Sequence, residues 1–362
     1  MEDARAWLAL TLVPGVALGA QHRLLEALGS ASAIVRSHPS IIENIVGPPA
    51  ARALAEGPDP RLVEKTLAWL GQAGRRLLVM GSEEYPAALL NVHSAPTVLY
   101  AEGRIELLNT PAVAIVGSRN ATTTGARDAQ ALAHGLSDAG LTIVSGLALG
   151  IDAAAHCGGL AGKASTIAVM GTGPDIHYPR RNMKLAARIA TEGCIVTEFP
   201  VGTPSAPGNF PRRNRLISGL SRGVLVVEAA LGSGSLITAK YALEQNRDVF
   251  AMPGSIHSTL SKGCHHLIKE GAKLVESAGD VLIEYGLMSA DRADRTAEEE
   301  TAANDPVLEA SGYAPMSIDE LAMHTGLGAA TLAARLTKLE LEGRIEVLPG
   351  GRFRRAPRRE IE

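Results

Sequence analysis

With 362 residues, the chain is long enough for two or three domains, and its 46% hydrophobic residues supply an ample core. The formal net charge of −3 argues neither for nor against a nucleic-acid partner. No apolar run approaches the roughly 20 residues of a membrane span, and the acidic start lacks the pattern of a signal peptide. The three cysteines form no Cys-x-x-Cys pair, so we expect a cytoplasmic protein with reduced thiols and no membrane partner.

The first 75 residues have the pattern of short helices. A turn at Pro14-Gly15 joins two apolar segments, and Gly29 follows the second at the position where helices usually stop. Such a turn is similar to helix-hairpin-helix and SAM-like bundles, which can bind DNA phosphates through backbone N–H groups. Because Ala17 stands where the hairpin's second glycine usually lies, a packing or interaction module is favoured over phosphate contact. The sequence predicts a helical SAM-like domain over residues 1–75.

Residues 76–287 are predicted to form an α/β domain. After a connecting stretch near residues 77–100, short apolar and β-branched runs alternate with helical windows. Apolar runs of this length indicate strands buried on both faces, as in a parallel sheet covered by helices. The runs are 112–116, 141–144, 166–170, 194–197, 224–227, 249–252 and 273–275. Right-handed crossovers then bring every strand-to-helix loop to one edge of the sheet.

The loops at that edge carry a predicted anion-binding site. Gly117, Ser118 and Arg119 follow the first run, and Ser145 and Gly146 follow the second. Arg119 stands at the expected start of a helix, where the guanidinium and the helix dipole both favour an anion. The alternative is an arginine salt-bridged to a neighbouring helix.

The segment from Phe210 to Arg215 places three guanidinium groups within four residues, ahead of a loop of small residues that follows the next strand. Arginine forks opposite free backbone N–H groups suit a phosphate-bearing ligand. Because they straddle Asn214, Arg213 and Arg215 would diverge from a helix start, so one could hold a phosphate while the other pairs with Asp152 or Glu228. The predicted contacts from this segment and the loop are Phe210, Arg213, Asn214, Arg215, Ser233, Gly234 and Ser235.

Two aromatic residues near this segment have open roles. Phe199 and Phe210 bracket the loop 200–209, and either could stack on a nucleobase. Packing in the core is the equally weighted alternative for both. The neighbouring Cys264-His265-His266 has metal-ligand residue types, but adjacent positions do not easily chelate one ion, so packing or a dimer contact is favoured.

The C-terminal part is predicted to be a flexible linker, 288–306, and a winged-helix-like domain with a basic tail, 307–362. Ser317 is expected to cap a helix with Glu320 as its capping-box partner, and a second helix and a short ribbon follow. The tail from Arg352 to Arg359 suits weak DNA phosphate contact, with a solvated, disordered terminus as the alternative.

The order and spacing of these motifs resemble the DNA-processing protein A (DprA, also called Smf) family, across the whole central domain. The matching segments are Gly117-Ser118-Arg119, 145–152, 171–175 with Tyr178-Pro179, Phe210 to Arg215, 227–229 with 233–239, and 252–254 with 263–268. The resemblance implies an extended Rossmann-like fold with a winged helix that binds single-stranded DNA. It also implies a homodimer that protects incoming strands and loads the RecA recombinase during natural transformation, with no catalytic residues and no cofactor or metal.

The resemblance also assigns residues. Arg119 matches the family's phosphate-contacting arginine, and a basic contact is expected after Tyr178-Pro179. The candidates for that contact are Arg180, Arg181 and Lys184. The dimer interface is expected around His265, Ile268 and Leu274, where the last strand leaves an edge to be covered.

Two enzyme classes were weighed against this interpretation. Gly171-Thr172-Gly173 lacks the third glycine of a dinucleotide fingerprint and the following ribose-binding carboxylate, so an NAD site is rejected. The alternative function is a nucleotide-binding or phosphoribohydrolase-type enzyme of the LOG-like Rossmann superfamily. Those enzymes carry a catalytic Glu close after their glycine-rich loop, whereas here no carboxylate follows the loop 231–238 until Glu244.

Overall fold

The computed structural model describes residues 2–288, 306–312, 314–341 and 343–356. The chain divides into two compact units, Met1–Leu287 and Met288–Glu362. Most of the predicted linker 288–306 lies outside the described residues. The predicted domain boundaries therefore stay predictions.

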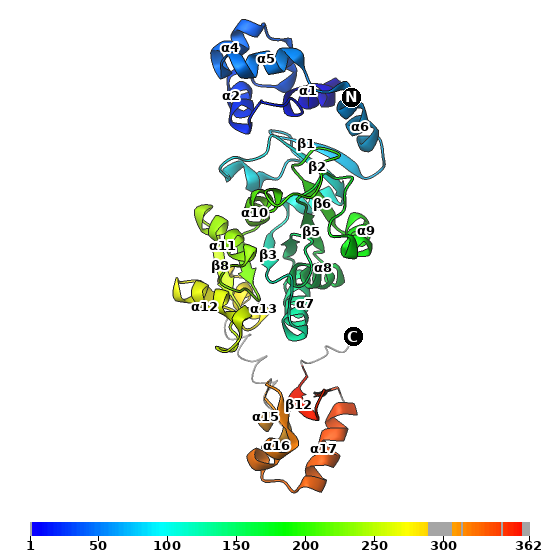
Figure 1. Ribbon diagram of the computed structural model, residues 1–362, viewed down its shortest axis with the longest axis vertical. Helices are drawn as coiled ribbons and strands as arrows, with labels where there is room; N and C mark the ends of the chain where they lie inside the picture. Colours follow the sequence, from blue (N-terminus) through cyan, green and yellow to red (C-terminus); the bar gives the residue numbers. More distant parts are fainter. Residues whose placement is uncertain (1, 289–305, 313, 342, 357–362) are drawn as a thin grey trace. The chain divides into compact units, whose positions relative to one another are not determined.

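Six short helices open the first unit (Figure 1): α1 (Glu2–Thr11), α2 (Leu18–Leu28), α3 (Ala31–Arg36), α4 (Pro39–Val46), α5 (Pro48–Glu56) and α6 (Pro60–Leu70). Proline stands in the first turn of α4, α5 and α6, where its missing N–H costs no hydrogen bond. Trp7, Leu24 and Trp69 are buried in one cluster with Tyr100 of the sheet. The helical character predicted for this part is confirmed.

The centre of the unit is a nine-stranded sheet in the order β1-β2-β6-β5-β4-β3-β7-β8-β9. The seven predicted runs all form strands, and β3 to β9 pair in parallel with one another. The strands are β1 (Arg75–Val79), β2 (Val98–Gly103), β3 (Ala112–Val116), β4 (Thr142–Ser145), β5 (Thr166–Val169), β6 (Cys194–Thr197), β7 (Gly223–Val226), β8 (Asp248–Ala251) and β9 (Lys273–Leu274).

The stretch predicted only as a connection, residues 77–100, supplies two strands that the sequence pattern does not predict. β1 pairs antiparallel with β2, and β2 pairs antiparallel with β6. Partners such as Tyr100 and Thr197 are about a hundred residues apart in the chain, so their pairing depends on tertiary structure rather than on local pattern.

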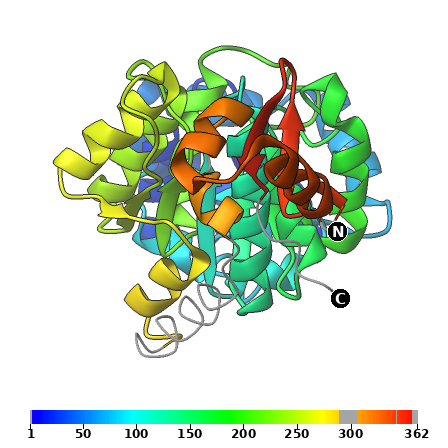
Figure 2. The same cartoon turned by 90° about the horizontal axis from the view of Figure 1, so that it is seen from below.

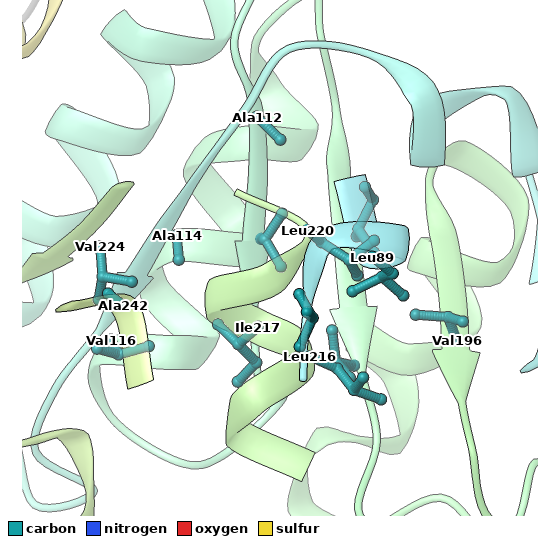
Figure 3. Close-up of a cluster of buried hydrophobic side chains, with 14 of the residues drawn as sticks. Leu89, Ala112, Ala114, Val116, Val196, Leu216, Ile217, Leu220, Val224 and Ala242 are labelled. Atoms are coloured by element: carbon teal, nitrogen blue, oxygen red, sulfur yellow. The ribbon is translucent and has the colours of Figure 1, made fainter. Parts of the chain in front are cut away.

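Helices cover both faces of the sheet. Leu216, Ile217 and Leu220 of one helix pack on the face that carries Ala114 and Val116 of β3 (Figure 3). α8 contacts β3 and β4, and α7 contacts β4, with no side chain of either helix in that cluster. The helices are α7 (Thr123–Asp138), α8 (Ile151–Ala161), α9 (Met183–Glu192), α10 (Asn209–Gly219), α11 (Gly234–Glu244), α12 (Lys262–Lys269) and α13 (Ala278–Glu284), with 3-10 turns η1 (Ala87–Asn91), η2 (Ile105–Asn109), η3 (Arg180–Asn182) and η4 (Thr259–Ser261). The predicted α/β class is confirmed.

The second unit is a small winged helix, with its helices beside the red hairpin in Figure 2. Its elements are α15 (Pro306–Ala310), β10 (Met316–Ser317), α16 (Ile318–Thr325), α17 (Ala329–Leu341), β11 (Ile345–Leu348) and β12 (Arg352–Arg355). The capping box of Ser317 and Glu320 is confirmed, and α16 ends at Gly326 in the left-handed conformation.

Arg352–Arg355 of the basic tail form a strand in this unit. β12 pairs with both β10 and β11, and Arg354 forms an ion pair of 2.7 Å with Glu346. The alternative of a disordered terminus is therefore wrong for Arg352–Arg355, because strand pairing fixes their backbone. Arg358 and Arg359 lie outside the described residues.

Candidate nucleic-acid interface

The predicted loops meet where the strand order reverses. β3 is followed along the chain by β4 on one side of it, and it pairs with β7 on the other side. Such switch points are where open α/β sheets bind ligands, in the crevice beyond the carboxyl ends of the strands. A cleft of about 840 Å³ lies there, lined by the loops after β3, β4 and β7 and by the first turns of α10 and α11.

Arg119 is exposed at the rim of this cleft. Its guanidinium carbon lies 5.3 Å from the centroid of the Phe210 ring, and the Phe210 ring lies 5.7 Å from that of Tyr178. Within the described ranges, no hydrogen bond or ion pair ties the Arg119 guanidinium to a carboxylate. The guanidinium is therefore open to an anionic ligand, beside an aromatic pair in which Tyr178 is 44% exposed.

Arg213 has the opposite environment. It is only 4% exposed, and its Nη1 donates to the carbonyl oxygens of Gly146, at 2.6 Å, and Val169. Burial lowers the pKa of Arg213 to about 10, against the opposing effect of the nearby Asp152 carboxylate. A Cβ on Gly146 would come within 2.5 Å of the guanidinium, so a larger residue there would displace Arg213. Arg213 therefore binds the loops after β4 and β5 together beneath the cleft.

Asp152 holds the same loop from its other side. Its Oδ2 accepts hydrogen bonds from the backbone N–H groups of Gly146 (3.1 Å) and Ala148 (3.3 Å). Burial raises the pKa of Asp152, and the positive charge of Arg213 and the two hydrogen bonds oppose that rise. No ion pair joins Asp152 to an arginine in the described part of the chain, so the predicted role of Asp152 as the internal partner of an arginine stays a prediction.

His156 supports this loop as well. It is fully buried, accepts a hydrogen bond from the Leu147 N–H at 3.2 Å, and contacts the Thr166 hydroxyl at 2.8 Å through Nδ1. Because the Thr166 hydroxyl donates to the Ile143 carbonyl, Nδ1 carries the proton and the ring is neutral. Burial lowers the pKa of His156 to about 3.

Asn214 connects α10 to the loop at the start of α11. It accepts a hydrogen bond of 3.2 Å from Arg213 and donates one of 3.3 Å to the Gly234 carbonyl. Ser233 caps α11, because its hydroxyl accepts from the Ser235 N–H at 3.3 Å. The backbone at Gly234 faces open space, so the start of α11 lies open toward the cleft.

Arg215 and Glu228 have partners other than those predicted from sequence. Arg215 is buried and donates to Glu198, a residue that the sequence motifs do not single out. Glu228 accepts hydrogen bonds from the backbone N–H (2.9 Å) and the hydroxyl (2.7 Å) of Thr122, the N-cap of α7. A carboxylate directly after a buried strand, as Glu198 is, was the available signal for an arginine partner.

The other predicted contacts are distributed as follows. Gly117 and Ser118 line the cleft, and the Ser118 hydroxyl accepts from the Asn120 N–H at 3.1 Å. Ser145 is fully buried, and its hydroxyl donates to the Ile115 carbonyl at 2.7 Å. Arg180, Arg181 and Lys184 are exposed on η3 and α9, outside the lining of the cleft.

The two candidate aromatic residues differ in how deeply they are buried. Phe199 is only 4% exposed, and the guanidinium carbon of Arg212 lies 5.2 Å from the centroid of the Phe199 ring. Phe210 is half-buried and lines the cleft. Of the two, only Phe210 presents a ring to a ligand in the cleft.

The predicted dimer residues lie at one end of the sheet. Leu274, on β9, is 43% exposed, and Ile268 is partly buried against the core. His265 contacts the Gly254 carbonyl at 3.0 Å through Nε2.

Among the residues that the structure describes, no group of His, Cys, Asp and Glu is arranged to hold a metal ion. No described helix is both long and apolar enough to cross a membrane.

The parallel sheet with helices on both faces and the separate winged helix define a Rossmann-like α/β protein with a winged-helix unit. A family model described as DNA recombination-mediator protein A matches residues 76–286, and one described as DprA winged helix domain matches residues 291–351. The chain belongs to the DNA recombination-mediator protein A family, as the resemblance predicted.

Individual relatives agree with this assignment. Protein Smf of Escherichia coli strain K12 is 42% identical over 305 residues, which cover 81% of this chain and 82% of that protein. The X-ray structure of DNA processing protein A from Streptococcus pneumoniae matches with a TM-score of 0.69 and 38% identity, covering 78% of this chain and 98% of that one. The Helicobacter pylori counterpart, whose structure is described for its single-stranded DNA binding mode, matches with a TM-score of 0.53 and 31% identity, covering 58% and 95%.

Proposed function

We propose that this protein is a recombination mediator that binds single-stranded DNA in the cleft beyond β3, β4 and β7. The observation that carries the proposal is the guanidinium of Arg119, which has no carboxylate partner among the described residues and lies beside the rings of Phe210 and Tyr178. A cation holds the phosphate backbone, while an aromatic face stacks on a base. Stacking of this kind requires a base that is free of its partner strand, so the cleft favours single strands over duplex.

The residues divide into contacts and supports. Arg119, the start of α11 and the Phe210 ring are the direct contacts in this proposal. Arg213, Asn214 and Ser145 act from beneath, because their polar groups are engaged with the protein. Arg180, Arg181 and Lys184 are proposed to hold the strand where it leaves the cleft, since they are exposed near the Tyr178 that lines it.

Partners and setting are proposed from the family resemblance. The bound strand would be protected and passed to the RecA recombinase, in the cytoplasm, during natural transformation. A homodimer through His265, Ile268 and Leu274 would place two clefts on one particle. Two linked sites raise the effective concentration on a long strand, so avidity exceeds the affinity of one cleft.

The alternative function is a LOG-like nucleotide-processing enzyme. The loop before α11 is followed by no carboxylate until Glu244, in the last turn of that helix, whereas the cleft opens at its first turn. Asp152 does line the cleft, but its Oδ2 accepts two backbone hydrogen bonds. The family match favours the mediator.

One experiment separates these functions. A band-shift assay compares a single-stranded oligonucleotide with its duplex, and a nucleotide-release assay runs on the same protein. The mediator predicts tight, sequence-independent binding of the single strand, weaker binding of the duplex and no release of base from nucleotide. Equal affinity for the two DNA forms at moderate salt, or release of free base, would contradict the proposal.

A further inference from the structure

Arg212 and Arg215 form a pair that the cleft does not use. They lie three residues apart on α10 and so share one face of the helix, and neither lines the cleft. Both donate to the same oxygen, Oε2 of Glu198. We call Arg212 and Arg215 the arginine pair.

The arginine pair lines a second cavity in the first unit, of about 750 Å³. Its lining also includes Tyr241 and Glu244 of α11, His93 before β2, and Leu18 at the start of α2. The cavity therefore lies between the N-terminal helices and the α/β domain. It shares no lining residue with the cleft.

One nitrogen of the pair lacks a partner. Arg215 is 8% exposed, and its Nη1 is a buried atom with no hydrogen-bond partner among the described residues. A buried charged donor that makes no hydrogen bond is costly, and an acceptor brought by a ligand would relieve that cost.

The start of α2 supplies further donors at the same cavity. Its N-cap, Ala17, has no side chain to accept a hydrogen bond, and both Ala17 and Leu18 line the cavity. Ala20 and Gln21 donate to the Ala17 carbonyl, so the N–H groups that the helix leaves open are those before them. The positive end of an eleven-residue helix thus lines the same cavity as the arginine pair.

The charges around the cavity favour an anion. Among the residues that line it, the arginine pair is cationic and Glu244 is the carboxylate. Outside the lining, Glu198 pairs with both arginines and Lys240 pairs with Glu244 at 3.9 Å, so the lining residues and their ion-pair partners together carry one positive charge.

We propose that this cavity is a second phosphate-binding site, distinct from the cleft, in which the arginine pair and the open N–H groups of α2 hold one phosphate group. The ligand is a phosphate ester, supplied either by the backbone of DNA or by a free nucleotide. The site gives a function to the helical hairpin at Pro14-Gly15, which leads into α2.

The first test titrates inorganic phosphate and 5′-dTMP into the full-length protein carrying Arg119→Ala, which weakens the contribution of the cleft. Binding should be detected, and Arg212→Gln in the same background should weaken it at least tenfold. Arg188→Gln is the matched control, because Arg188 is equally exposed (54% against 55% for the side chains) and also pairs with one glutamate. That control should bind phosphate as its parent does.

The second test addresses α2. Ala17→Asp would place a carboxylate on the open N–H groups, so it should weaken phosphate binding at least tenfold without lowering the melting temperature. Ala17→Asn caps the helix without a charge and should give a smaller loss. No detectable phosphate binding, or binding that both Arg212→Gln and Ala17→Asp leave unchanged, would overturn the proposal.

Competition identifies the source of the phosphate. An oligonucleotide without terminal phosphate that displaces dTMP would show that the site holds the DNA backbone, and failure to displace it would show a free phosphate ester. Because the titration uses small anions, it reports on this cavity even if the protein binds no single strand, so the two proposals fail separately.

Discussion

The loop after β3 and the helix α10 both carry arginines, and the structure uses them in opposite ways. Arg119 lies in the open, 5.3 Å from an aromatic ring centroid and without a carboxylate partner in the described part of the chain. Arg213 and Arg215 are buried, and their guanidinium groups are engaged with carbonyl oxygens and with Glu198. The single arginine is the better candidate for ligand contact, although the cluster is the more prominent motif.

The difference teaches that the density of basic residues does not by itself locate an anion site. A guanidinium can stabilise loops by donating to several backbone carbonyls, because it has five N–H donors in a fixed geometry. In α10 it does so beneath the cleft, where Arg213 donates to the carbonyl oxygens of Gly146 and Val169. Substituting a supporting arginine should lower the stability of the protein, whereas substituting a contacting arginine should lower its affinity for DNA.

Arg213→Ala should give the largest effect, on stability. Removing a buried cation leaves two carbonyls and the Asp152 carboxylate without it, which typically costs about 3–5 kcal/mol. Urea denaturation of the first unit measures this, with Arg188→Ala as a surface control expected to change by less than about 1 kcal/mol. If Arg213→Ala lowers the free energy of unfolding by less than about 1 kcal/mol, Arg213 is not the structural support described here.

Arg119→Ala should lower the affinity for a single-stranded oligonucleotide by about 1.5–3 kcal/mol, the range for hydrogen bonds to charged groups. Its melting temperature should stay near that of the wild type, because the side chain is exposed. Fluorescence anisotropy with a labelled oligonucleotide measures the affinity. If instead the protein unfolds readily while the folded fraction binds normally, Arg119 is a structural residue.

His156 should make the loop between β4 and α8 sensitive to acid. Its folded-state pKa, about 3, lies below the ordinary value of 6.5, so its contribution to stability is present above pH 6.5 and is lost as the pH falls toward 3. The loss should approach about 1.4 kcal/mol per pH unit, or about 2 kcal/mol between pH 6.5 and 5. Denaturation at several pH values should show this slope in the wild type and a shallower one in His156→Gln. Equal slopes would mean that the neutral ring is not what holds Leu147.

The predicted dimer edge provides a test that changes no residue of the cleft. Replacing Ile268 and Leu274 with Glu should give a folded monomer, with Leu274→Glu alone as the milder variant because Leu274 is already 43% exposed. Affinity for long oligonucleotides should fall at least about tenfold, through lost avidity, while affinity for short ones is kept. Sedimentation that is unchanged in the double variant would place the interface elsewhere.

The strands of the parallel sheet were predictable because each is a short, continuous apolar run between helical windows, as in 112–116 and 194–197. β1 and β2 escaped prediction, since their place in the sheet depends on the pairing of β2 with a distant strand. At the site, the sequence predicts that Arg119 lies with Ser233 and Phe210. It leaves open which of Arg213 and Arg215 faces a ligand, because helix rotation and the depth of burial decide that.

The salt dependence of single-strand binding tests the central claim most directly. Each phosphate contact on a single strand contributes about 0.7 to the slope of log K against log salt concentration. The slope should therefore be smaller by about 0.7 in Arg119→Ala than in the wild type. An unchanged slope for Arg119→Ala would show that Arg119 holds no phosphate and would contradict the account.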